Sequence, residues 1–350
     1  MVKRLAFAVP GDLATPTGGY AYDRRMISEL GRLGWQIDVV GLGDGFPLPS
    51  DTTRAAAQAS LFDIPRGRTV AIDGLALGAL PEAASQLRTR NALLAVVHHP
   101  LALETGLSAE NVRKLRASER EALAAVGSVV VTSAATQRCL VEDYGVPAER
   151  IFIAPPGSDP VPPAQGSTDG VVRLLSVGAI VPRKGFDVLV AALGTLAELP
   201  WRLTIVGDRT RDRQAAVQLD ADIARHRFSD RVTVLGEVPP HQLSELYAAA
   251  DVFVLASRFE GYGMAYAEAI ATGLPVIGTS AGAIPETVPP GAGILVMPGD
   301  ASALAGALRR IIEDPGERQR LSGVARAAAA HLPTWQASAR IFARAIETVE

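Results

Sequence analysis

The chain has 350 residues, enough for two domains of about 150 residues each. Apolar residues make up 48% of it and charged residues 20%, which is the composition of a folded globular protein rather than a disordered one. Lys and Arg number 34 against 37 Asp and Glu, a net charge of −3, which excludes a protein that coats nucleic acid and predicts no nucleic-acid partner. The single cysteine, Cys139, excludes an intramolecular disulfide and a cysteine-rich zinc site.

The N-terminus predicts a β-strand and not a signal peptide. Its apolar run, 5–9, has only five residues, which is too short for the core of a secretion signal. No other run approaches the ~18 consecutive apolar residues of a membrane-spanning helix. Because the lone cysteine also needs no oxidising compartment, the sequence predicts a cytoplasmic protein, soluble or at most peripheral to a membrane.

In both halves of the chain, short apolar runs of strand length alternate with longer segments of helical period. This pattern predicts an α/β fold with two Rossmann-like, doubly wound parallel-sheet domains that face a common cleft. The expected strands of the first half are 3–9, 36–41, 69–73, 93–97, 128–132 and 151–154. Those of the second half are 172–177, 202–207, 232–235, 252–256, 275–278 and 293–296.

A proline-rich segment, 155–167, separates the two halves and cannot form regular structure, because proline fixes φ and removes a backbone donor. We therefore expect an N-terminal domain over 1–160 and a C-terminal domain over 168–333. An amphipathic helix over 334–350 is expected to pack back on the first domain. In open α/β sheets ligands bind beyond the carboxyl ends of the strands, and candidate site residues are expected there.

The loop after the first strand, 11–20, ends in Gly18 and Gly19 before a helix predicted to start at Ala21. Glycines at a helix start allow a ligand to approach the backbone, and the free N–H groups attract anions, so this loop is a candidate phosphate site. It matches neither common phosphate-binding glycine motif, and an ordinary turn is the alternative. A second glycine cluster, 41–45, is followed by prolines that cannot open a helix, which predicts a turn.

Two adjacent histidines, His98 and His99, follow the apolar strand predicted over 93–97. They are therefore expected at a carboxyl end, where functional residues gather. Because neighbouring side chains on an extended backbone project in different directions, only one of the two is expected to reach a substrate.

In the second half, the strand predicted over 172–177 leads into a loop that carries Arg183 and Lys184. Two adjacent cations on such a loop fit a clamp for phosphate, with arginine giving bidentate geometry and lysine a point charge. The alternative is a solvated basic turn.

The most informative segment follows the strand predicted over 252–256. It places Glu260 on a loop and Glu268 eight residues later, on a helix expected to begin near Tyr262. The glycines between them allow close backbone approach to a ligand. Carboxylates accept hydrogen bonds from sugar hydroxyls while helix amides hold oxyanions, so this arrangement suits a polyhydroxy ligand that carries a diphosphate.

Two further charged segments favour structural interpretations. Asp220-Ala221-Asp222 has the D-x-D pattern of some metal-dependent sugar transferases, but it lies in a predicted helix, where a solvated face is expected; no essential metal is predicted. The basic amphipathic segment 112–120 is either a solvated face or a peripheral contact with anionic lipid.

The second half, 174–298, resembles the retaining glycosyltransferases of family four, whose GT-B architecture has two Rossmann-like domains. The most specific match is the E-x7-E signature, formed by Glu260 and Glu268 and followed by Gly273-Leu274-Pro275-Val276-Ile277. The other matching segments of this half are Val177-Gly178, Pro182-Arg183-Lys184-Gly185, Ile205-Val206-Gly207-Asp208 and Ala250-Asp251-Val252-Phe253-Val254. Over the first half, the Gly18-Gly19 loop and His98 match.

The resemblance implies a metal-independent retaining enzyme without a cofactor. Such an enzyme moves a hexose-type sugar from a nucleotide-diphosphate donor to an acceptor hydroxyl on a lipid, a glycan or a small molecule. The second domain would bind the donor and the first the acceptor.

By position, the resemblance implies that Glu260 would face the hydroxyls of the donor sugar and that Glu268 would bind the ribose. Lys184, with Arg183, would neutralise the leaving diphosphate, and His98 would contact the sugar near its reacting carbon. Ala179 stands where the family commonly has a second cationic residue, an arginine. The other donor-binding positions predicted are Gly18, Gly19, His99, Gly207, Gly261, Tyr262, Gly263 and Met264.

Two alternatives remain at this stage. A GT-B sugar-nucleotide epimerase would bind the same donor and isomerise it without an acceptor. A non-catalytic sugar-nucleotide binding protein would bind the donor without turnover. The sequence leaves the sugar, the nucleotide and the oligomeric state open.

Overall fold

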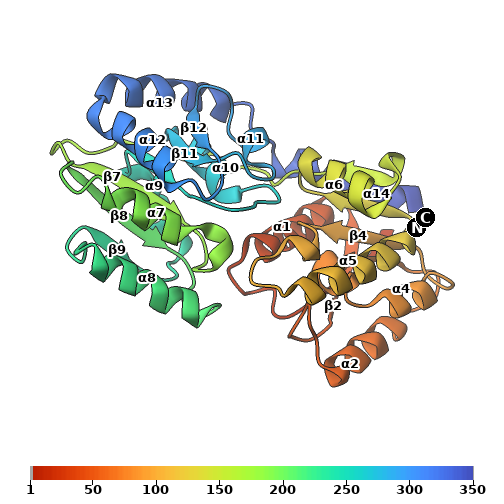
Figure 1. Cartoon of the computed structure of the whole chain (residues 1–350). Coiled ribbons are helices and arrows are strands. Elements are labelled where there is room, and N and C mark those ends of the chain that lie inside the picture. Colours follow the sequence, from red (N-terminus) through yellow and green to blue (C-terminus); the bar gives the residue numbers. More distant parts are fainter. Residues whose placement is uncertain (1–2, 350) are drawn as a thin grey trace. The chain divides into compact units, whose positions relative to one another are not determined.

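The computed structural model describes residues 3–349 and divides into two compact units. The first unit comprises Met1–Gly157 with Pro333–Glu350, and the second comprises Ser158–Leu332 (Figure 1). No helix or strand is present between 154 and 171, where the proline-rich segment lies. Each unit contains one six-stranded parallel sheet with helices around it, which confirms the predicted α/β class.

The sheet of the first unit has the strand order β2-β1-β3-β4-β5-β6. Its strands are β1 (Lys3–Val9), β2 (Trp35–Gly41), β3 (Thr69–Asp73), β4 (Leu93–Val97), β5 (Ser128–Val131) and β6 (Ile151–Ile153). Its helices are α1 (Gly18–Arg32), α2 (Asp51–Phe62), α3 (Gly74–Leu77), α4 (Pro81–Leu87), α5 (Ala109–Ala124), α6 (Ala134–Tyr144) and α14 (Trp335–Val349), with 3-10 turns η1 (Leu101–Leu103) and η2 (Ala148–Arg150).

The sheet of the second unit has the order β12-β11-β10-β7-β8-β9. Its strands are β7 (Val172–Val177), β8 (Trp201–Val206), β9 (Val232–Val234), β10 (Val252–Val254), β11 (Val276–Thr279) and β12 (Gly293–Val296). Its helices are α7 (Phe186–Gly194), α8 (Arg213–Arg225), α9 (Pro240–Ala249), α10 (Met264–Ala271), α11 (Ile284–Thr287), α12 (Ala301–Glu313) and α13 (Pro315–Ala329), with the 3-10 turn η3 (Pro182–Lys184).

The strands lie within two residues of the bounds expected from the sequence because they are buried on both faces. Every residue of β3, β4 and β5 is buried, so each of these strands is a nearly continuous apolar run. The edge strand β2 instead has an exposed, polar-containing pattern. The core of the first unit forms between these central strands and the helices that cover them.

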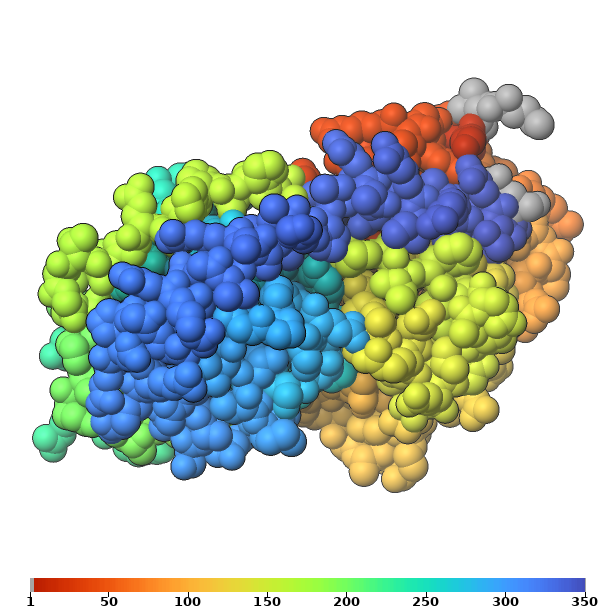
Figure 2. All heavy atoms as spheres, turned by 90° about the horizontal axis from the view of Figure 1, so that it is seen from above, coloured from red at the N-terminus to blue at the C-terminus, as the bar shows by residue number. Residues whose placement is uncertain are grey.

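The C-terminal helix α14 lies beside α1 and against β5 of the first unit, and Figure 2 shows this blue segment running over the first unit's atoms. The Ser128 hydroxyl donates to the carbonyl of Ala345 at 2.9 Å. Phe342, fully buried, stacks on Phe7 of β1. The chain thus leaves the first unit at 157 and returns to it at 333.

Two helix starts differ from the predictions. Helix α1 begins at Gly18, not Ala21, because the hydroxyl of Thr17 caps it by accepting from the Tyr20 amide at 3.2 Å. Gly18 and Gly19 are therefore its first turn rather than the loop before it. Helix α10 begins at Met264, not near Tyr262, because Gly263 adopts a left-handed conformation with φ of 89°.

Candidate functional site

The strand order of the second unit places a reversal point between β7 and β10. From β7 the chain continues to β8 and β9 on one side of the sheet, and then crosses to β10 on the other side. Ligands of open α/β sheets bind at the carboxyl ends of strands where the order reverses in this way. The loops that follow β7 and β10 carry the residues predicted from the sequence, Arg183 with Lys184 and Glu260 with Gly261.

Glu260 is the centre of this site. Its side chain is buried, and its Oε1 accepts from the Ser257 hydroxyl at 2.6 Å. Its backbone carbonyl accepts from the Ala283 amide at 2.9 Å, and a Cβ at Gly282 would lie only 2.3 Å from the same oxygen. The glycine therefore lets the next loop approach closely enough to fix the Glu260 backbone.

Two cations from the loop after β7 contact this carboxylate. The Lys184 Nζ lies 2.6 Å from Glu260 Oε1, and the Arg183 Nη1 lies 3.4 Å from Oε2. Arg183 also donates to the Phe259 carbonyl at 3.0 Å. We call Glu260, Lys184 and Arg183 the Glu260 cluster. Burial alone would raise the pKa of Glu260, but Lys184 and then Arg183 outweigh burial and hold the pKa below its usual value.

Glycines allow the loops of the site to pack against one another. A Cβ at Gly185, where φ is 67°, would lie 2.0 Å from the Ala256 carbonyl oxygen. A Cβ at Gly207 would lie 1.9 Å from the carbonyl oxygen of Gly178, and the Lys184 stem lies over Gly178. Gly207 was predicted to bind the donor; in the structure its contact is with the neighbouring loop.

Helix α10 follows the Glu260 loop and starts without a side-chain cap. Its N-terminal amides, which include that of Met264, have the geometry that favours an anion. Thr287 donates its hydroxyl to the carbonyl of Tyr262, which fixes the residues before the helix, and partial burial raises the pKa of the Tyr262 phenol to about 12. The predicted residues Gly261, Tyr262 and Gly263 thus form the loop between Glu260 and α10.

Glu268 lies one helical turn after Met264, rather than two turns into a helix as predicted. Its Oε2 accepts from the Tyr247 hydroxyl at 2.9 Å. Burial raises the pKa of Glu268 above its usual value, although the Tyr247 hydrogen bond and the charge of Lys184 oppose this. The two carboxylates therefore differ in their partners: two cations favour the ionised form of Glu260, whereas Glu268 accepts a hydrogen bond from a neutral phenol.

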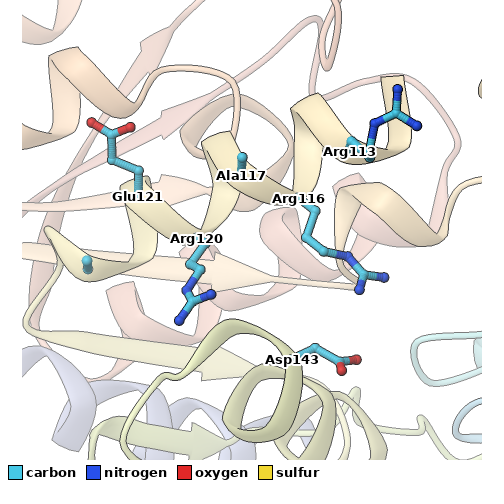
Figure 3. Close-up of a pocket in the computed structure, with 7 residues that line it drawn as sticks. Arg113, Arg116, Ala117, Arg120, Glu121 and Asp143 are labelled. Carbon is cyan, nitrogen blue, oxygen red and sulfur yellow. The ribbon is translucent and has the colours of Figure 1, made fainter. Parts of the chain in front are cut away.

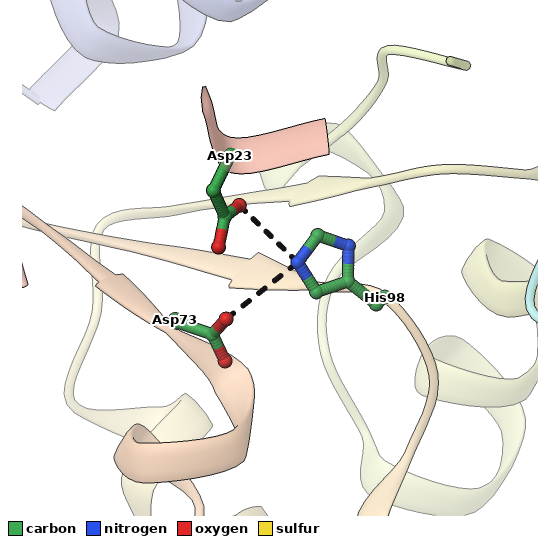
Figure 4. A group of neighbouring side chains, drawn as sticks. All are labelled: Asp23, Asp73 and His98. Carbon is green, nitrogen blue, oxygen red and sulfur yellow. Dashed lines mark ion pairs between the residues drawn. The ribbon is translucent and has the colours of Figure 1, made fainter. Parts of the chain in front are cut away.

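In the first unit, His98 follows the carboxyl end of β4, as its position in the sequence predicts. Its Nε2 lies 3.2 Å from Asp23 Oδ1 and 3.6 Å from Asp73 Oδ2 (Figure 4). We call these three residues the His98 cluster. A Cβ at Gly19 would lie 3.2 Å from the imidazole, so the Gly18-Gly19 turn of α1 packs against His98.

Neither aspartate was predicted from the sequence. Asp73 ends β3, and its place at a carboxyl strand end was a usable signal. Asp23 lies on α1 one turn after Gly19 and has no comparable sequence signal. His99 lies apart from the cluster, with its Nε2 3.4 Å from Glu104 Oε2.

The D-x-D segment lies on α8, as predicted, but only Asp220 is exposed. Asp220 pairs with Arg209 at 2.5 Å, and Asp222 is buried and pairs with Arg225 at 2.8 Å. The expectation of a wholly solvated face was therefore wrong for Asp222, which faces the core side of an amphipathic helix.

The basic segment 112–120 lies on α5. Its arginines, with Asp143 at the end of α6, line a hollow of about 570 Å³ (Figure 3). The lining residues are Arg113, Arg116, Ala117, Arg120, Glu121, Ala124 and Asp143. Among residues 3–349, no helix is long and apolar enough to cross a membrane.

Part of the chain is similar in sequence to known glycosyltransferases. Residues 161–328 match the family model of glycosyl transferases group 1. A D-inositol 3-phosphate glycosyltransferase of Xylanimonas cellulosilytica is 33% identical over 227 residues, which are 60% of this chain and 54% of that protein. An MMP alpha-(1->4)-mannosyltransferase of Mycolicibacterium hassiacum is 27% identical over 269 residues, 71% of this chain and 63% of that protein. The chain spans about half the length of the first of these curated relatives.

Solved structures cover both units. Sucrose-phosphate synthase from Thermosynechococcus elongatus superposes with a TM-score of 0.82 at 23% identity, covering 98% of each chain. HepE from Anabaena, in complex with UDP and glucose, gives a TM-score of 0.77 at 19% identity and covers 99% of this chain and 100% of its own. At these identities the likeness shows the fold, which is the GT-B fold predicted from the sequence.

Proposed function

Because residues 161–328 form a domain of the group 1 glycosyltransferases, we propose that the protein transfers a hexose-type sugar from a nucleotide-diphosphate donor to an acceptor hydroxyl. The observation that carries this proposal is the Glu260 cluster, which lies at the reversal point of the second sheet. The HepE structures, with UDP or UDP-glucose bound, support a nucleotide-sugar donor for this fold.

The cluster has the charge that departure of a diphosphate requires. Two cations contact one carboxylate, so positive charge is already in place beside Glu260 before any ligand binds. When the sugar–phosphate bond breaks, negative charge grows on the leaving diphosphate, and fixed cations stabilise that charge most when they are already in place. We assign this role to Lys184 and Arg183.

Glu260 has two roles in this proposal. Before the donor binds, its carboxylate holds Lys184 and Arg183 in position, which lowers the cost of reorganisation during the reaction. With the donor bound, its oxygens accept hydrogen bonds from sugar hydroxyls. The amides of Gly263 and Met264, at the start of α10, hold phosphate or sugar oxygens, and Glu268 accepts from the ribose.

We propose that the transfer is retaining and needs no metal ion. The two cations and the helix N-terminus supply the positive charge that a divalent ion supplies in other transferases. Rates that are unchanged by EDTA support this part of the proposal; a rate that falls with EDTA and returns with added Mg²⁺ or Mn²⁺ overturns it. The anomeric configuration of the product, read by NMR coupling constants, tests retention.

We assign acceptor binding to the first unit, and a cytoplasmic site of action at the membrane surface. The arginines of α5 at 113, 116 and 120 line one hollow, and none of them has an ion pair in the structure of residues 3–349, which favours an anionic lipid surface. Flotation with phosphatidylglycerol vesicles, but not with phosphatidylcholine vesicles, is expected. Loss of flotation in Arg116→Glu would locate the lipid contact on α5. A wild-type protein that does not float with either kind of vesicle would overturn this proposal and mean that the basic face of α5 is only solvated.

The experiment for the main proposal measures release of nucleoside diphosphate and sugar transfer with a panel of UDP- and GDP-hexoses. The acceptors are lipids, oligosaccharides and small polyols. Lys184→Ala and Glu260→Gln are expected to lower the rate by ~10²-fold or more. Lys3→Ala is the matched control, because Lys3 pairs with Glu347 on the surface of the first unit.

Each other outcome points to a different function. Equal activity in wild type, Lys184→Ala and Glu260→Gln overturns the site. Isomerised nucleotide sugar without an acceptor identifies an epimerase, and tight donor binding without turnover of any acceptor identifies a binding protein.

A further inference from the structure

The His98 cluster is a buried charge group built from three separate elements. His98 follows β4, Asp73 ends β3, and Asp23 comes from the second turn of α1 (Figure 4). Asp23 is 0% and Asp73 2% exposed, whereas the His98 side chain retains 19%. The cluster therefore has one partly open side, and that side belongs to the imidazole.

The two aspartates are in different states. Asp73 Oδ1 accepts from the Leu75 amide at 2.6 Å as the N-cap of α3. Neither oxygen of Asp23 accepts a hydrogen bond of good geometry from any residue in the described range, and His98 Nε2 is the nearest cation. An ionised carboxylate in such a place is costly, so Asp23 requires a shared proton or a cation beside it.

The pKa directions agree with this geometry. Burial raises the pKa of Asp23 to about 7, although His98 opposes it. Burial alone would also raise the pKa of Asp73, but the interaction with nearby His98 and the hydrogen bond from the Leu75 amide hold it below its usual value. Burial would lower the pKa of His98, and the two carboxylates reverse this and raise it to about 10.

The other groups packed on the imidazole do not compete for its protons. Tyr22 of α1 presents its ring edge, with the centroids 5.3 Å apart, and its hydroxyl donates to the Ala154 carbonyl at 2.9 Å. Burial and then Asp23 raise the pKa of the Tyr22 phenol, so it stays neutral. Directly after β5, the Thr132 hydroxyl donates to the His98 carbonyl at 3.3 Å rather than to the ring. Asp23 and Asp73 are thus the charged groups that face Nε2.

We propose that Asp23 and Asp73 are positioning residues that hold His98 as an imidazolium, with Nε2–H directed between the two carboxylates and Nδ1–H left as a hydrogen-bond donor on the opposite side of the ring. Figure 4 shows Nδ1 turned away from both aspartates. In the transfer reaction, and resting there on the proposed function, His98 acts as a fixed donor to a substrate oxygen and not as a general base. Asp23 is the decisive partner, because its only compensation is this proton.

A divalent cation is the competing occupant of the same place. The three ligand atoms lie within 4.8 Å of one another, so an ion could replace the shared proton. A proton is favoured because the cluster offers three ligand atoms, whereas Mg²⁺ and Ca²⁺ take six or more, mostly oxygens and waters, and the cluster is almost closed to water.

The test reads the histidine directly and needs no activity. The protein, dialysed against EDTA, is titrated from pH 5.5 to 11.5 while long-range ¹H–¹⁵N correlations of the imidazole rings are recorded. The chain has five histidines, and the His98 signals are those that disappear in His98→Gln. We expect His98 to keep both ring protons above pH 8, and Asp23→Asn to lower its titration midpoint by more than one pH unit.

Asp12→Asn is the matched control, because Asp12 is an exposed aspartate of the same unit, and it is expected to leave the His98 midpoint unchanged. A wild-type His98 that titrates near pH 6.5, or is neutral throughout, overturns the proposal. A shift of the His98 signals on adding Mn²⁺ or Zn²⁺ at equimolar concentration overturns it in favour of a metal site.

A second measurement links the cluster to turnover. If the protein transfers sugar, Asp23→Asn is expected to move the alkaline limb of kcat to lower pH, with the donor KM changed less than threefold. An unshifted pH profile together with a shifted NMR midpoint would confirm the imidazolium and overturn its role in the reaction. Failure to find any transfer leaves the NMR result to decide the protonation state alone, so the two proposals fail separately.

Discussion

The two units carry charge clusters of opposite composition at the carboxyl ends of their sheets. In the second unit, one carboxylate, Glu260, lies between Lys184 and Arg183. In the first unit, one imidazole, His98, lies between Asp23 and Asp73. Both clusters use residues that follow the central pair of strands, β7 with β10 in one sheet and β3 with β4 in the other. Both clusters thus lie at the carboxyl ends of central strands and have opposite compositions, although the order of the first sheet reverses between β1 and β3.

The opposite charges of the two clusters indicate which of them can bind an anionic ligand. The Glu260 cluster contains two cations, which attract an anion, whereas the His98 cluster contains two carboxylates, which repel one. This asymmetry supports placing the diphosphate on the second unit and uncharged hydroxyl groups on the first.

The largest expected effect comes from removing the single carboxylate of the second unit. Glu260→Ala leaves Lys184 and Arg183 close together without the group that joins them, and we expect the free energy of unfolding of this unit to fall by about 3 kcal/mol. Urea unfolding followed by limited proteolysis and mass spectrometry reports each unit separately. Glu198→Ala is the control, since Glu198 pairs with Arg309 on the surface, where solvent screens the pair, and its loss is expected to leave the free energy of unfolding nearly unchanged. Equal losses would contradict the assignment of Glu260 as the centre of the site.

The second prediction concerns pH, and the two units are expected to respond in opposite directions. Because Lys184 and Arg183, against burial, hold the pKa of Glu260 below its usual value, its contribution is present above ~4.3 and is lost as pH falls through the lowered folded pKa. The pKa of His98 is raised to about 10, against ~6.5 when unfolded, so its contribution is complete below ~6.5 and is lost as pH rises toward 10.

The same urea assay across pH 3 to 10 checks this. The first unit should weaken between pH 7 and 10 by an amount on the order of 3 kcal/mol, and the second unit should weaken only on the acid side. A first unit that gains stability over this alkaline range would show that the imidazole is neutral.

The fold was predictable because parallel strands buried on both faces are continuous apolar runs. Strands such as β1, β3 and β4 have the bounds expected from the sequence. The helix starts were less predictable, because glycine is equally compatible with a loop and with the first turn of a helix. Thr17 was a usable capping signal for α1, whereas the left-handed Gly263 that delays α10 has no counterpart in hydrophobic period.

The residues of the Glu260 cluster could be predicted from the sequence, whereas only one residue of the His98 cluster was. Arg183, Lys184 and Glu260 were predicted because they follow strands and belong to a familiar pattern, although more than 70 residues separate the cations from the carboxylate. The partners of His98 were missed. Asp23 comes from a helix whose other residues are ordinary amphipathic positions, and only the packing of α1 on the sheet brings its carboxylate to the imidazole.

The third prediction compares the loss of a carboxylate in each cluster. Asp23→Ala is expected to change the stability of the first unit by less than ~1 kcal/mol, because Asp73 remains beside His98 and a buried carboxylate without a hydrogen-bond donor is removed. The measurement is the same urea assay, with Glu260→Ala as the reference. A loss as large as that of Glu260→Ala would mean that the attraction between Asp23 and the imidazolium outweighs the cost of burying the Asp23 carboxylate.

The smallest effect is expected at the second histidine. His99 lies 3.4 Å from Glu104, and both side chains are partly exposed, at 24% and 33%, so solvent screens their interaction. His99→Gln should therefore leave the titration midpoint of His98 unchanged and alter the rate of sugar transfer by less than about threefold, in contrast to any change at His98 itself. The imidazole NMR titration measures the His98 midpoint of this variant, and the transfer assay measures its rate. A large loss of sugar transfer in His99→Gln would support the sequence-based prediction that His99 binds the donor. It would also show that the site of the first unit extends beyond His98, the histidine that the two aspartates hold.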